Sequence, residues 1–559
     1  MAARILIIVP IARVMGSTHS DRLTTVLSAP AETERRATPL TRDFVVKAFV
    51  ICLSFANLCF VNVWAEVTDR DLDFFKRYLL SWQELAAVTL DVLLLAVLLF
   101  IPVYLAAKSG NRKVIWIVKV CALAGLLYPL NILRKWVSPS VFPPFPVRIA
   151  LAVAGVAAII LLVRKWGSKS IAVTYTVLTI SSPLLPVVVA GAAWNIHTKH
   201  AEDRLPLAMI PQKAGAPRVL WFIFDEWDGA LTFGRRPANF TLPHLDRFRS
   251  ESFHADRAYT VSRETVISVP SLLTGKIFLD KQWKGTSELL LTYDPAKPPE
   301  PLTSERTIFS EVRAAGYNAA IAGNYLPYCR LFDVATCEWH GNPDFRPPEW
   351  EVPTTVGEHM VLAARRQVDQ LPFSRRIGFL REIHENAGLR RRLLAVPYRE
   401  IHEAAMRSIA DPRLNLVFVH WDFPHPTARF EAAKDDFSDN PANTYLDNLK
   451  LVDRTVRDIR SALEQANLWD SSTILLTSDH PLRVNNWDSR MLAPPQAGEV
   501  TQTSEVPFLL KMAGQKEEFE YSRAMQTVVT KDLLLSIMRG ELTRPEQVAA
   551  WLDRNPPRL

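Results

Sequence analysis

Five apolar stretches in the first third of the chain constrain its fold more than any other feature. Residues from about 44 to 194 are dominated by apolar side chains, whereas the remainder of the 559 residues has the composition of ordinary soluble protein. A helix needs about 20 predominantly apolar residues to cross the hydrocarbon core of a bilayer. The sequence therefore predicts a helical membrane domain over 44–194 with about five spans, of which the fourth is the weakest. The expected spans are Ala48–Trp64, Leu85–Ala106, Val114–Leu133, Ile149–Val163 and Ile171–Trp194.

Basic residues beside these spans indicate which ends face the cytoplasm. The tail before the first span and the second–third and fourth–fifth connections are basic, whereas the first–second connection also contains acidic residues. The third–fourth connection is basic too and argues for the opposite orientation. We place the N-terminus inside, so that five crossings put the C-terminal part outside a bacterial-type cytoplasmic membrane. The expected organisation is a cytoplasmic tail at 1–43, a linker at 195–215 and an extracytoplasmic (periplasmic) domain at 216–559.

The net charge of +7 is compatible with either nucleic acid or an anionic membrane surface as a partner. Basic residues that flank membrane spans account for this excess. The sequence contains no zinc-finger, homeodomain or RNA-binding aromatic motif. We therefore expect the membrane as a partner and no nucleic acid.

Two cysteines, Cys329 and Cys337, lie beyond the membrane domain. The other three, Cys52, Cys59 and Cys121, fall within expected spans, where packing explains them. An extracytoplasmic location favours a disulfide between Cys329 and Cys337. The alternative is two free buried thiols, and a zinc site would require two further ligands at close spacing.

In the C-terminal part, short β-rich runs alternate with amphipathic segments. The near-continuous apolar runs Val219–Phe224, Asn415–His420 and Thr473–Thr477 are typical of strands buried on both faces. Between them, stretches such as Leu242–Ser250 and Asn443–Ala466 are amphipathic and read as helices. This alternation predicts an α/β sandwich around a largely parallel sheet. In such folds, functional residues collect just beyond the carboxyl ends of the strands.

Polar residues follow two of these strands directly. Asp225-Glu226 ends the first run, and Ser478-Asp479-His480 follows the third. Thr265 precedes an apolar helical stretch, and the field at a helix N-terminus favours an anionic nucleophile or a bound phosphate. Taken separately, these residues read equally well as helix caps and surface turns. Carboxylates and imidazole are also the ligand types that suit zinc or manganese.

Several sequence blocks occur in the order seen in one enzyme superfamily. Val-Leu-x-x-x-x-Asp-Glu is followed by Leu-Pro-His-Leu-Asp-Arg-Phe and by Ser-Leu-Leu-Thr-Gly. Further blocks are Ala-Gly-Tyr at 315–317, Phe-Val-His-Trp-Asp-Phe-Pro-His at 418–425, Tyr-Leu-Asp-Asn at 445–448, Thr-Ser-Asp-His at 477–480 and Val-Pro-Phe-Leu-Leu at 506–510. Over about 216–515 the chain thus resembles the sulfatase branch of the alkaline phosphatase superfamily, which implies the α/β sandwich fold of that type.

The nucleophile position separates the subgroups of this superfamily. Sulfatases have a cysteine or serine there, which is modified to formylglycine, whereas this chain has Thr265-Val-Ile-Ser-Val-Pro. That block is similar to the Thr-x-x-Ser-Val-Pro block of bacterial phosphoethanolamine transferases. Lipoteichoic acid synthases, which are also membrane-bound, use threonine and carry five N-terminal spans as well. An unmodified threonine cannot perform formylglycine chemistry, so the resemblance disfavours true sulfate-ester hydrolysis.

The resemblance also implies a divalent metal, zinc or manganese first, with calcium or magnesium as alternatives. The expected ligands are Asp225, Glu226, Asp479, His480 and the hydroxyl of Thr265, which would be the nucleophile. The implied reaction moves a phospholipid headgroup through a phosphothreonine intermediate onto an envelope glycan or lipid.

One histidine and two arginines are further candidates for substrate binding. His425 aligns with a family histidine that contacts substrate oxygens or a second metal, whereas His420 reads as a buried structural residue. Arg483 and Arg490 could supply positive charge, because guanidinium binds phosphate bidentately. The alternative for both arginines is an exposed position on a surface loop.

The chain departs from the family pattern at three positions. Pro481 replaces the usual glycine after Asp-His, Glu505 stands in place of a histidine, and Asn324 in place of a lysine. These departures put a second metal site in doubt.

Three functional hypotheses remain open. The first is the headgroup phosphotransferase, and the second is a membrane-anchored, sulfatase-like hydrolase or phosphodiesterase acting on sulfate or phosphate esters. The third is a scaffold that keeps the fold without catalysis. An arginine-rich insertion at Val361–Ala404 reads either as a solvated helix or as an interfacial helix beside anionic headgroups.

Overall fold

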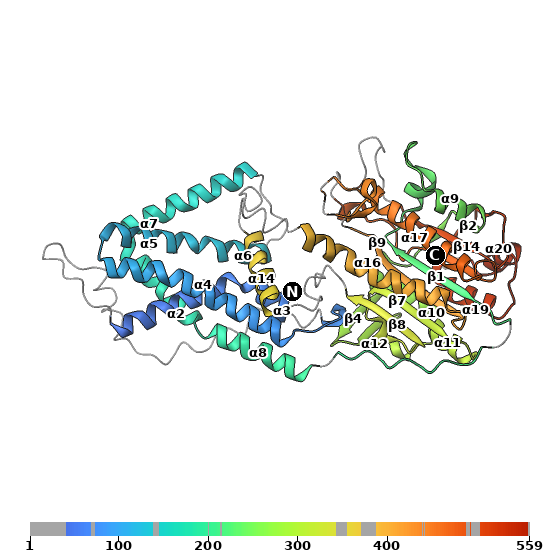
Figure 1. Ribbon diagram of the computed structural model, residues 1–559, viewed down its shortest axis with the longest axis horizontal. Coiled ribbons are helices and arrows are strands. Elements are labelled where there is room, and N and C mark those ends of the chain that lie inside the picture. Colours follow the sequence, from blue (N-terminus) through green and yellow to red (C-terminus); the bar gives the residue numbers. More distant parts are fainter. Residues whose placement is uncertain are drawn as a thin grey trace. The chain divides into compact units, whose positions relative to one another are not determined.

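The chain divides into two compact units, which Figure 1 shows as a bundle of helices and an α/β unit. The computed structural model describes residues 41–68, 73–137, 145–199, 201–212, 215–341, 355–370, 387–426, 428–438, 440, 442–487, 492 and 503–556. The helical unit comprises Leu80–His197 together with the described residues up to Thr68 and helix α14. The α/β unit, called the catalytic unit below, contains the described residues from Thr198 onward, apart from α14, and also residues 73–79.

The helical unit is built from long apolar helices. Its members are α2 (Arg42–Cys59), α3 (Val61–Thr68), α4 (Trp82–Ser109), α5 (Arg112–Gly125), α6 (Leu127–Val137), α7 (Phe145–Ser181), α8 (Leu184–Thr198) and α14 (Val356–Gln370). Helix α4 begins where the Ser81 hydroxyl accepts a hydrogen bond from the Glu84 amide, and it ends at left-handed Gly110. Along α4, Leu94, Leu98 and Leu105 are about half exposed, as expected of side chains that face lipid.

By length and composition, three helices within the described residues could cross a membrane. They are Trp82–Ser109, Arg112–Ile132 and Ile171–Thr198, which coincide with the predicted second, third and fifth spans. The full set of five spans is not confirmed. The first predicted span is split between α2 and α3, and the fourth lies in α7, whose backbone leaves helical geometry at Trp166.

Part of the predicted insertion belongs to the helical unit. Helix α14 packs against α4, and the Tyr128 hydroxyl of α6 lies 2.6 Å from Oε1 of Gln367 on α14. Gln367 in turn donates to Asn62 of α3 at 3.1 Å. These contacts place α14 among apolar helices. The arginines of the predicted insertion between residues 371 and 386 lie outside the described residues.

The catalytic unit is centred on an eight-stranded sheet with the order β15-β2-β14-β12-β1-β9-β7-β8. Five neighbouring strands, β12, β1, β9, β7 and β8, run parallel, and β14 is antiparallel to both of its neighbours. The strands are β1 (Val219–Asp225), β2 (Phe253–Ala255), β7 (Ala319–Tyr325), β8 (Thr336–Gly341), β9 (Leu416–Pro424), β12 (Thr473–Thr477), β14 (Phe508–Lys511) and β15 (Phe519–Tyr521). The largely parallel sheet of the sequence prediction is thus present, with an antiparallel element near one edge.

Alternate side chains of β1 enter two separate cores. Trp221 and Ile223 pack on one face with α10 (Thr265–Thr274), α11 (Ile308–Ala314), α19 (Thr530–Met538) and α20 (Pro545–Arg554). Phe222 and Phe224 pack on the other face with α9 (Pro243–Ser250), α16 (Ala387–Ala410) and α17 (Tyr445–Gln465). All seven residues of β1 are buried, which explains the continuous apolar run in the sequence.

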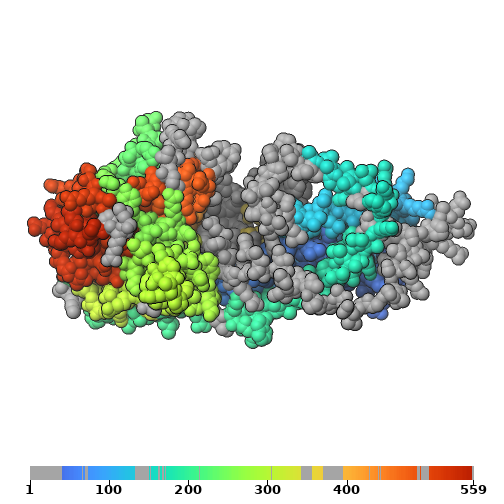
Figure 2. All heavy atoms as spheres, turned by 180° about the vertical axis from the view of Figure 1, so that it is seen from behind, coloured from blue at the N-terminus to red at the C-terminus, as the bar shows by residue number. Residues whose placement is uncertain are grey.

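Smaller elements complete the catalytic unit. They are α12 (Tyr328–Leu331), the sheet of β3 (Ala258–Tyr259), β13 (Glu505–Val506) and β16 (Met525–Gln526), the sheet of β4 (Asp280–Lys284), β5 (Glu288–Thr292) and β6 (Glu300–Pro301), and the pair β10 (Phe430–Glu431) and β11 (Asp436–Phe437). In the space-filling view, the residues after about 505, coloured red, form a continuous part of the surface of this unit (Figure 2).

A short segment from between α3 and α4 is built into the core of the catalytic unit. Phe74 and Phe75 in this segment are fully buried. The Phe75 ring lies 5.0 Å from that of Trp283 and 5.3 Å from that of Tyr325. Beside them, Asp73 forms ion pairs with Lys76 and Lys199. Residues 73–79, called the phenylalanine segment below, therefore fold with a domain that follows them by more than a hundred residues.

The structure joins Cys329 of α12 to Cys337 of β8, with Cα atoms 5.6 Å apart, in agreement with the predicted disulfide. Arg330 beside it stacks on Trp339 of β8, with 4.8 Å between its guanidinium carbon and the ring centre.

Candidate active site

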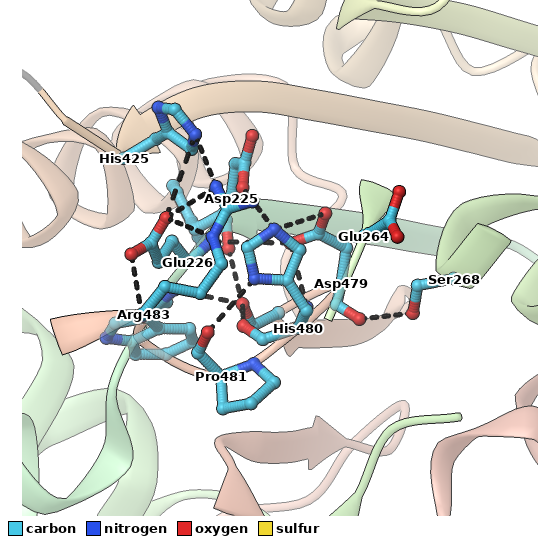
Figure 3. A network of polar contacts seen from close by, with 12 residues as sticks. Asp225, Glu226, Glu264, Ser268, His425, Asp479, His480, Pro481 and Arg483 are labelled. Carbon is cyan, nitrogen blue, oxygen red and sulfur yellow. Dashed lines mark hydrogen bonds and ion pairs between the residues drawn. The ribbon is translucent and has the colours of Figure 1, made fainter. Parts of the chain in front are cut away.

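The candidate site lies at the carboxyl ends of three adjacent parallel strands. Strand β1 ends at Asp225, β12 is followed by Asp479 and His480, and β9 is followed by His425. Because β1 lies between β12 and β9, the residues after all three strands reach the same edge of the sheet. Figure 3 shows these side chains pointing toward one another.

The backbone beyond β1 is held in an uncommon conformation. Glu226 has φ of 64°, in the left-handed region that non-glycine residues seldom occupy. The Tyr445 hydroxyl of α17 donates to the Glu226 carbonyl at 2.9 Å, and the Ser478 hydroxyl accepts from the Trp227 amide at 2.9 Å. The Glu226 amide donates to Oδ1 of Asp479 at 3.3 Å. These bonds fix the strained turn so that Asp225 and Glu226 both face the site.

Asp225, Asp479 and His480 form a cluster that is called the carboxylate–histidine cluster below. Their potential ligand atoms lie within 4.8 Å of one another, and all three side chains are buried. His480 Nδ1 lies 3.0 Å from the Pro481 carbonyl, so Nδ1–H donates there. Nε2 then faces the carboxylates, 3.2 Å from Oδ1 of Asp225 and 3.6 Å from Oδ2 of Asp479.

The charges of this cluster are not balanced within it. Burial lowers the pKa of His480, but the carboxylates of Asp479 and Asp225 outweigh burial and raise it to about 9. Oδ2 of Asp479 is buried without a hydrogen-bond partner among the described residues. A buried site with excess negative charge, an oriented imidazole and an unsatisfied carboxylate oxygen fits a divalent cation. The donor set of two carboxylates and one imidazole suits zinc or manganese.

Glu226 is held differently from these ligands. Its Oε2 accepts from Nε and Nη2 of Arg483 at 3.1 and 2.8 Å, and its Oε1 accepts from the Arg483 amide at 2.7 Å. The Trp487 indole also donates to Oε1, at 3.3 Å. His425 Nε2 lies 2.6 Å from Nη2 of Arg483 and 3.7 Å from Oε2 of Glu226. The attraction of Glu226 outweighs burial and raises the pKa of Arg483 further.

Thr265 is the first residue of α10 and is 4 % exposed. One turn later, the Ser268 hydroxyl donates to the main-chain carbonyl of Asp479, as Figure 3 shows. This bond ties the first turn of α10 to the loop that carries the carboxylate–histidine cluster. Ser268 stands inside the Thr265-Val-Ile-Ser-Val-Pro block, where the sequence alone does not distinguish it from its neighbours.

The remaining predicted residues have different surroundings. Glu505 accepts from the Tyr259 hydroxyl at 3.1 Å, and Asn324 donates to Asp422 at 2.8 Å, so both are held by the protein. His420 is fully buried, with Nδ1 2.7 Å from the Tyr328 hydroxyl. Arg490 lies outside the described residues.

The residues that hold the site residues in position, without themselves offering a ligand or a nucleophile, were not found from the sequence. Tyr445 and Ser478 were visible only as parts of larger motifs, and Tyr328 was not considered. Their roles depend on hydrogen bonds to residues distant in the chain, which no local pattern encodes.

Buried carboxylates and imidazole that converge beyond parallel strands are typical of metal-dependent α/β enzymes, among them those of the sulfatase/alkaline phosphatase superfamily. The sequence model of the Sulfatase family matches residues 217–539, more than half of the chain. The chain therefore belongs to the Sulfatase family and is an enzyme of that superfamily. The comparison with curated proteins gave no match.

Solved structures of this superfamily resemble the chain at low sequence identity. Phosphonate monoester hydrolase of Agrobacterium radiobacter is 13% identical with a TM-score of 0.36, over 58% of this chain and 74% of that chain. The enzyme from Silicibacter pomeroyi is 15% identical with a TM-score of 0.38, over 58% and 73%. Murine ectonucleotide pyrophosphatase/phosphodiesterase 5 is 12% identical with a TM-score of 0.33, over 58% and 95%.

Proposed function

We propose that the protein is a metal-dependent phosphotransferase that moves a phospholipid headgroup, through a phosphothreonine intermediate, onto an envelope glycan or lipid. The observation that carries this proposal is the buried threonine at the N-terminus of α10, tied through Ser268 to the loop of Asp479. The family match supports an ester-cleaving or ester-transferring enzyme, and the apolar helices support a membrane location.

The position of Thr265 suits a nucleophile for three reasons. Its hydroxyl belongs to an unmodified residue, so formylglycine chemistry is not available to it. The helix N-terminus contributes unpaired amide groups and a positive field, both of which favour an attacking oxyanion and an incoming phosphate. Ser268 holds the helix against the cluster, so that Thr265 is presented by a rigid element.

The carboxylate–histidine cluster would hold the divalent cation, which lowers the pKa of a nearby hydroxyl and offsets charge on phosphate oxygens. In the first step Oγ of Thr265 forms a bond to phosphorus, and the bond between phosphorus and the diacylglycerol oxygen breaks. Diacylglycerol leaves with a proton on that oxygen. In the second step an acceptor hydroxyl forms the new phosphorus–oxygen bond and loses its proton, and Oγ of Thr265 is released and protonated.

The phenylalanine segment supports an odd total number of membrane crossings. Because residues 73–79 fold within the catalytic unit, they lie on the same side of a membrane as the residues after 198. The chain between them then crosses the membrane an even number of times. Three candidate helices account for three crossings, and the first part of α7 provides a fourth. With a crossing through α2 and α3 before them, the total is five, which places the N-terminus and the catalytic unit on opposite sides of the membrane. The flanking basic residues then favour an internal N-terminus and an extracytoplasmic catalytic unit.

The second candidate function is a membrane-anchored, sulfatase-like hydrolase or phosphodiesterase. The family match favours it, because this match reports the ester-cleaving fold but not the acceptor. The two functions share the first step and differ in whether water or an organic hydroxyl completes the second.

Purified full-length protein in detergent, supplied with labelled phosphatidylethanolamine or phosphatidylglycerol, tests both functions. We expect release of diacylglycerol and a phosphorylated peptide that contains Thr265. Label on a lipid or glycan acceptor would identify transfer, whereas free headgroup phosphate would identify hydrolysis.

The variant Thr265→Ala should lose turnover and retain bound metal, because the cluster is unchanged. Thr265→Ser is the matched control and should keep measurable turnover, because it keeps a hydroxyl at the same position. Normal turnover in Thr265→Ala would refute the nucleophile assignment.

A further inference from the structure

The Glu226 carboxylate has four donors, three of them from Arg483. Oε1 accepts from the Arg483 amide and from the Trp487 indole, and Oε2 accepts from Nε and Nη2 of Arg483. Glu226 is fully buried, so this pair is shielded from water. Two guanidinium N–H groups converge on the single oxygen Oε2, and such charge-assisted hydrogen bonds are stronger than those between neutral groups. A cation that used Glu226 as a ligand would have to displace this guanidinium.

The same guanidinium also reaches His425. Nη2 lies 2.6 Å from His425 Nε2, which faces Glu226 from the other side at 3.7 Å. Asp225, Glu226 and His425 have ligand atoms within 4.8 Å of one another, which is the geometry of a second metal group. Figure 3 shows the Arg483 side chain reaching both Glu226 and His425. Positive charge is therefore already present at this second group.

The carboxylate–histidine cluster differs from the second group in this respect. No arginine or lysine pairs with it among the described residues, and Oδ2 of Asp479 has no hydrogen-bond partner there. The two groups share Asp225. The carboxylate–histidine cluster lacks a positively charged side chain and needs a cation, whereas the second group already contains the guanidinium of Arg483.

We propose that this enzyme binds one divalent cation, at Asp225, Asp479 and His480, and that Arg483 replaces a second metal as the anion-binding group. Glu226 then positions Arg483 rather than coordinating the metal. The anion is a phosphoryl or sulfuryl group, and its assignment as the phosphate of a lipid headgroup rests on the proposed function.

The guanidinium has donors left for such an anion. Of its five N–H groups, Nε and the two on Nη2 face Glu226 and His425, and the two on Nη1 have no partner among the described residues. The Arg483 side chain is 24% exposed, in contrast to Glu226 behind it, so a ligand can reach it. The two bonds from Nε and Nη2 to the buried Oε2 of Glu226 also fix the guanidinium plane before the anion arrives.

Metal content and phosphate binding test this proposal in the full-length protein. After loading with zinc and dialysis, elemental analysis should give one equivalent per chain. Glu226→Gln should retain that equivalent, because Glu226 is not a ligand. Calorimetry with inorganic phosphate should show a roughly ten- to hundredfold weaker affinity in Arg483→Gln than in the wild type, and a smaller loss in Arg483→Lys.

Arg247→Gln is the matched control, because that arginine is 60% exposed on α9; it should bind phosphate as the wild type does. Two zinc equivalents in the wild type, loss of zinc in Glu226→Gln, or wild-type phosphate affinity in Arg483→Gln would each overturn the proposal. If Arg483→Gln does not fold, the zinc counts of the wild type and Glu226→Gln still decide. Failure to transfer a lipid headgroup, with these results intact, would overturn the proposed function alone.

Discussion

The two ends of the central sheet bury polar side chains to the same extent but satisfy them differently. At the amino ends, Arg218, Asn318 and Asn415 are nearly inaccessible, and each bonds to main-chain groups of neighbouring segments. At the carboxyl ends, Asp479 and His480 are just as inaccessible but have side-chain atoms without a hydrogen-bond partner among the described residues. Burial alone therefore does not distinguish these two sets of residues, whereas their hydrogen bonding does.

The network at the amino ends of the strands shows how buried polar side chains can have all their hydrogen bonds formed. Asn318 accepts from the Ile210 amide and donates to the carbonyls of Ile210 and Arg413, at 2.8 to 3.0 Å. Asn415 beside it donates to the Pro217 carbonyl and accepts from the Asn318 amide. These bonds hold the segment before β1 against the starts of β7 and β9. At the other end, comparable groups are left available for a ligand.

Asp479→Asn should have the largest effect, and it acts at the carboxyl end. The amide oxygen can keep the bonds from the Glu226 and His480 amides, but the charge that attracts the cation is lost. We expect turnover to fall by about three orders of magnitude or more and bound metal to be lost. Thermal unfolding of the metal-free variant should occur no lower than that of the metal-free wild type, because Asp225 and Asp479 share the one imidazole of His480 and the change removes their excess negative charge. A large loss of stability would place Asp479 among the structural residues.

Asn318→Ala should have the next largest effect, and it acts at the amino end. Its removal leaves three main-chain groups without their partner, which costs about 2–3 kcal/mol in the free energy of unfolding. Turnover per folded molecule should not change. Gln212→Ala, which removes one partly buried bond to Asn415, is the control and should cost less than about 1 kcal/mol. Equal losses in the free energy of unfolding for Asn318→Ala and Gln212→Ala would contradict a structural role for the amino-end network.

Lys511 provides a smaller, pH-dependent test at the amino end. It pairs in register with Ile474 near the start of β12 and donates to the carbonyls of Trp469 and Met512. Burial lowers its pKa from 10.5 to about 8. Between these pH values the unfolded chain binds the extra proton, so the free energy of unfolding should rise with pH across this window.

After allowance for solvent screening, we expect the rise due to Lys511 to be about 1–2 kcal/mol. Lys511→Met should lack that rise, and thermal unfolding at pH 8 and pH 10 measures the difference. Identical pH profiles would show that the ammonium of Lys511 is well solvated.

The fold was largely predictable because its signals are local. The apolar runs at β1, β9 and β12 are continuous since both faces of these strands are covered, and the expected extracytoplasmic location of Cys329 and Cys337 indicated their disulfide. The polar residues Asp225-Glu226 and Ser478-Asp479-His480 were also recognisable, since they lie directly at the ends of predicted strands.

The partners within the site were not predictable. Arg483 was considered as an anion-binding residue, but its side-chain bonds to Glu226 join residues 257 positions apart in the sequence. The same holds for the Ser268 bond to Asp479, which spans 211 positions. Such contacts depend on loop conformation, including the left-handed turn at Glu226, and a residue pattern does not specify it.

The burial of Phe74 and Phe75 affects how this enzyme can be handled. A soluble protein truncated to begin after residue 198 would lack two aromatic rings from its interior and would expose the apolar surfaces of Trp283 and Tyr325 that face them. Such a fragment should aggregate unless residues 73–79 are restored, for example by a short fusion at its N-terminus. The same two rings make the N-terminal half of the polypeptide a participant in folding the C-terminal half.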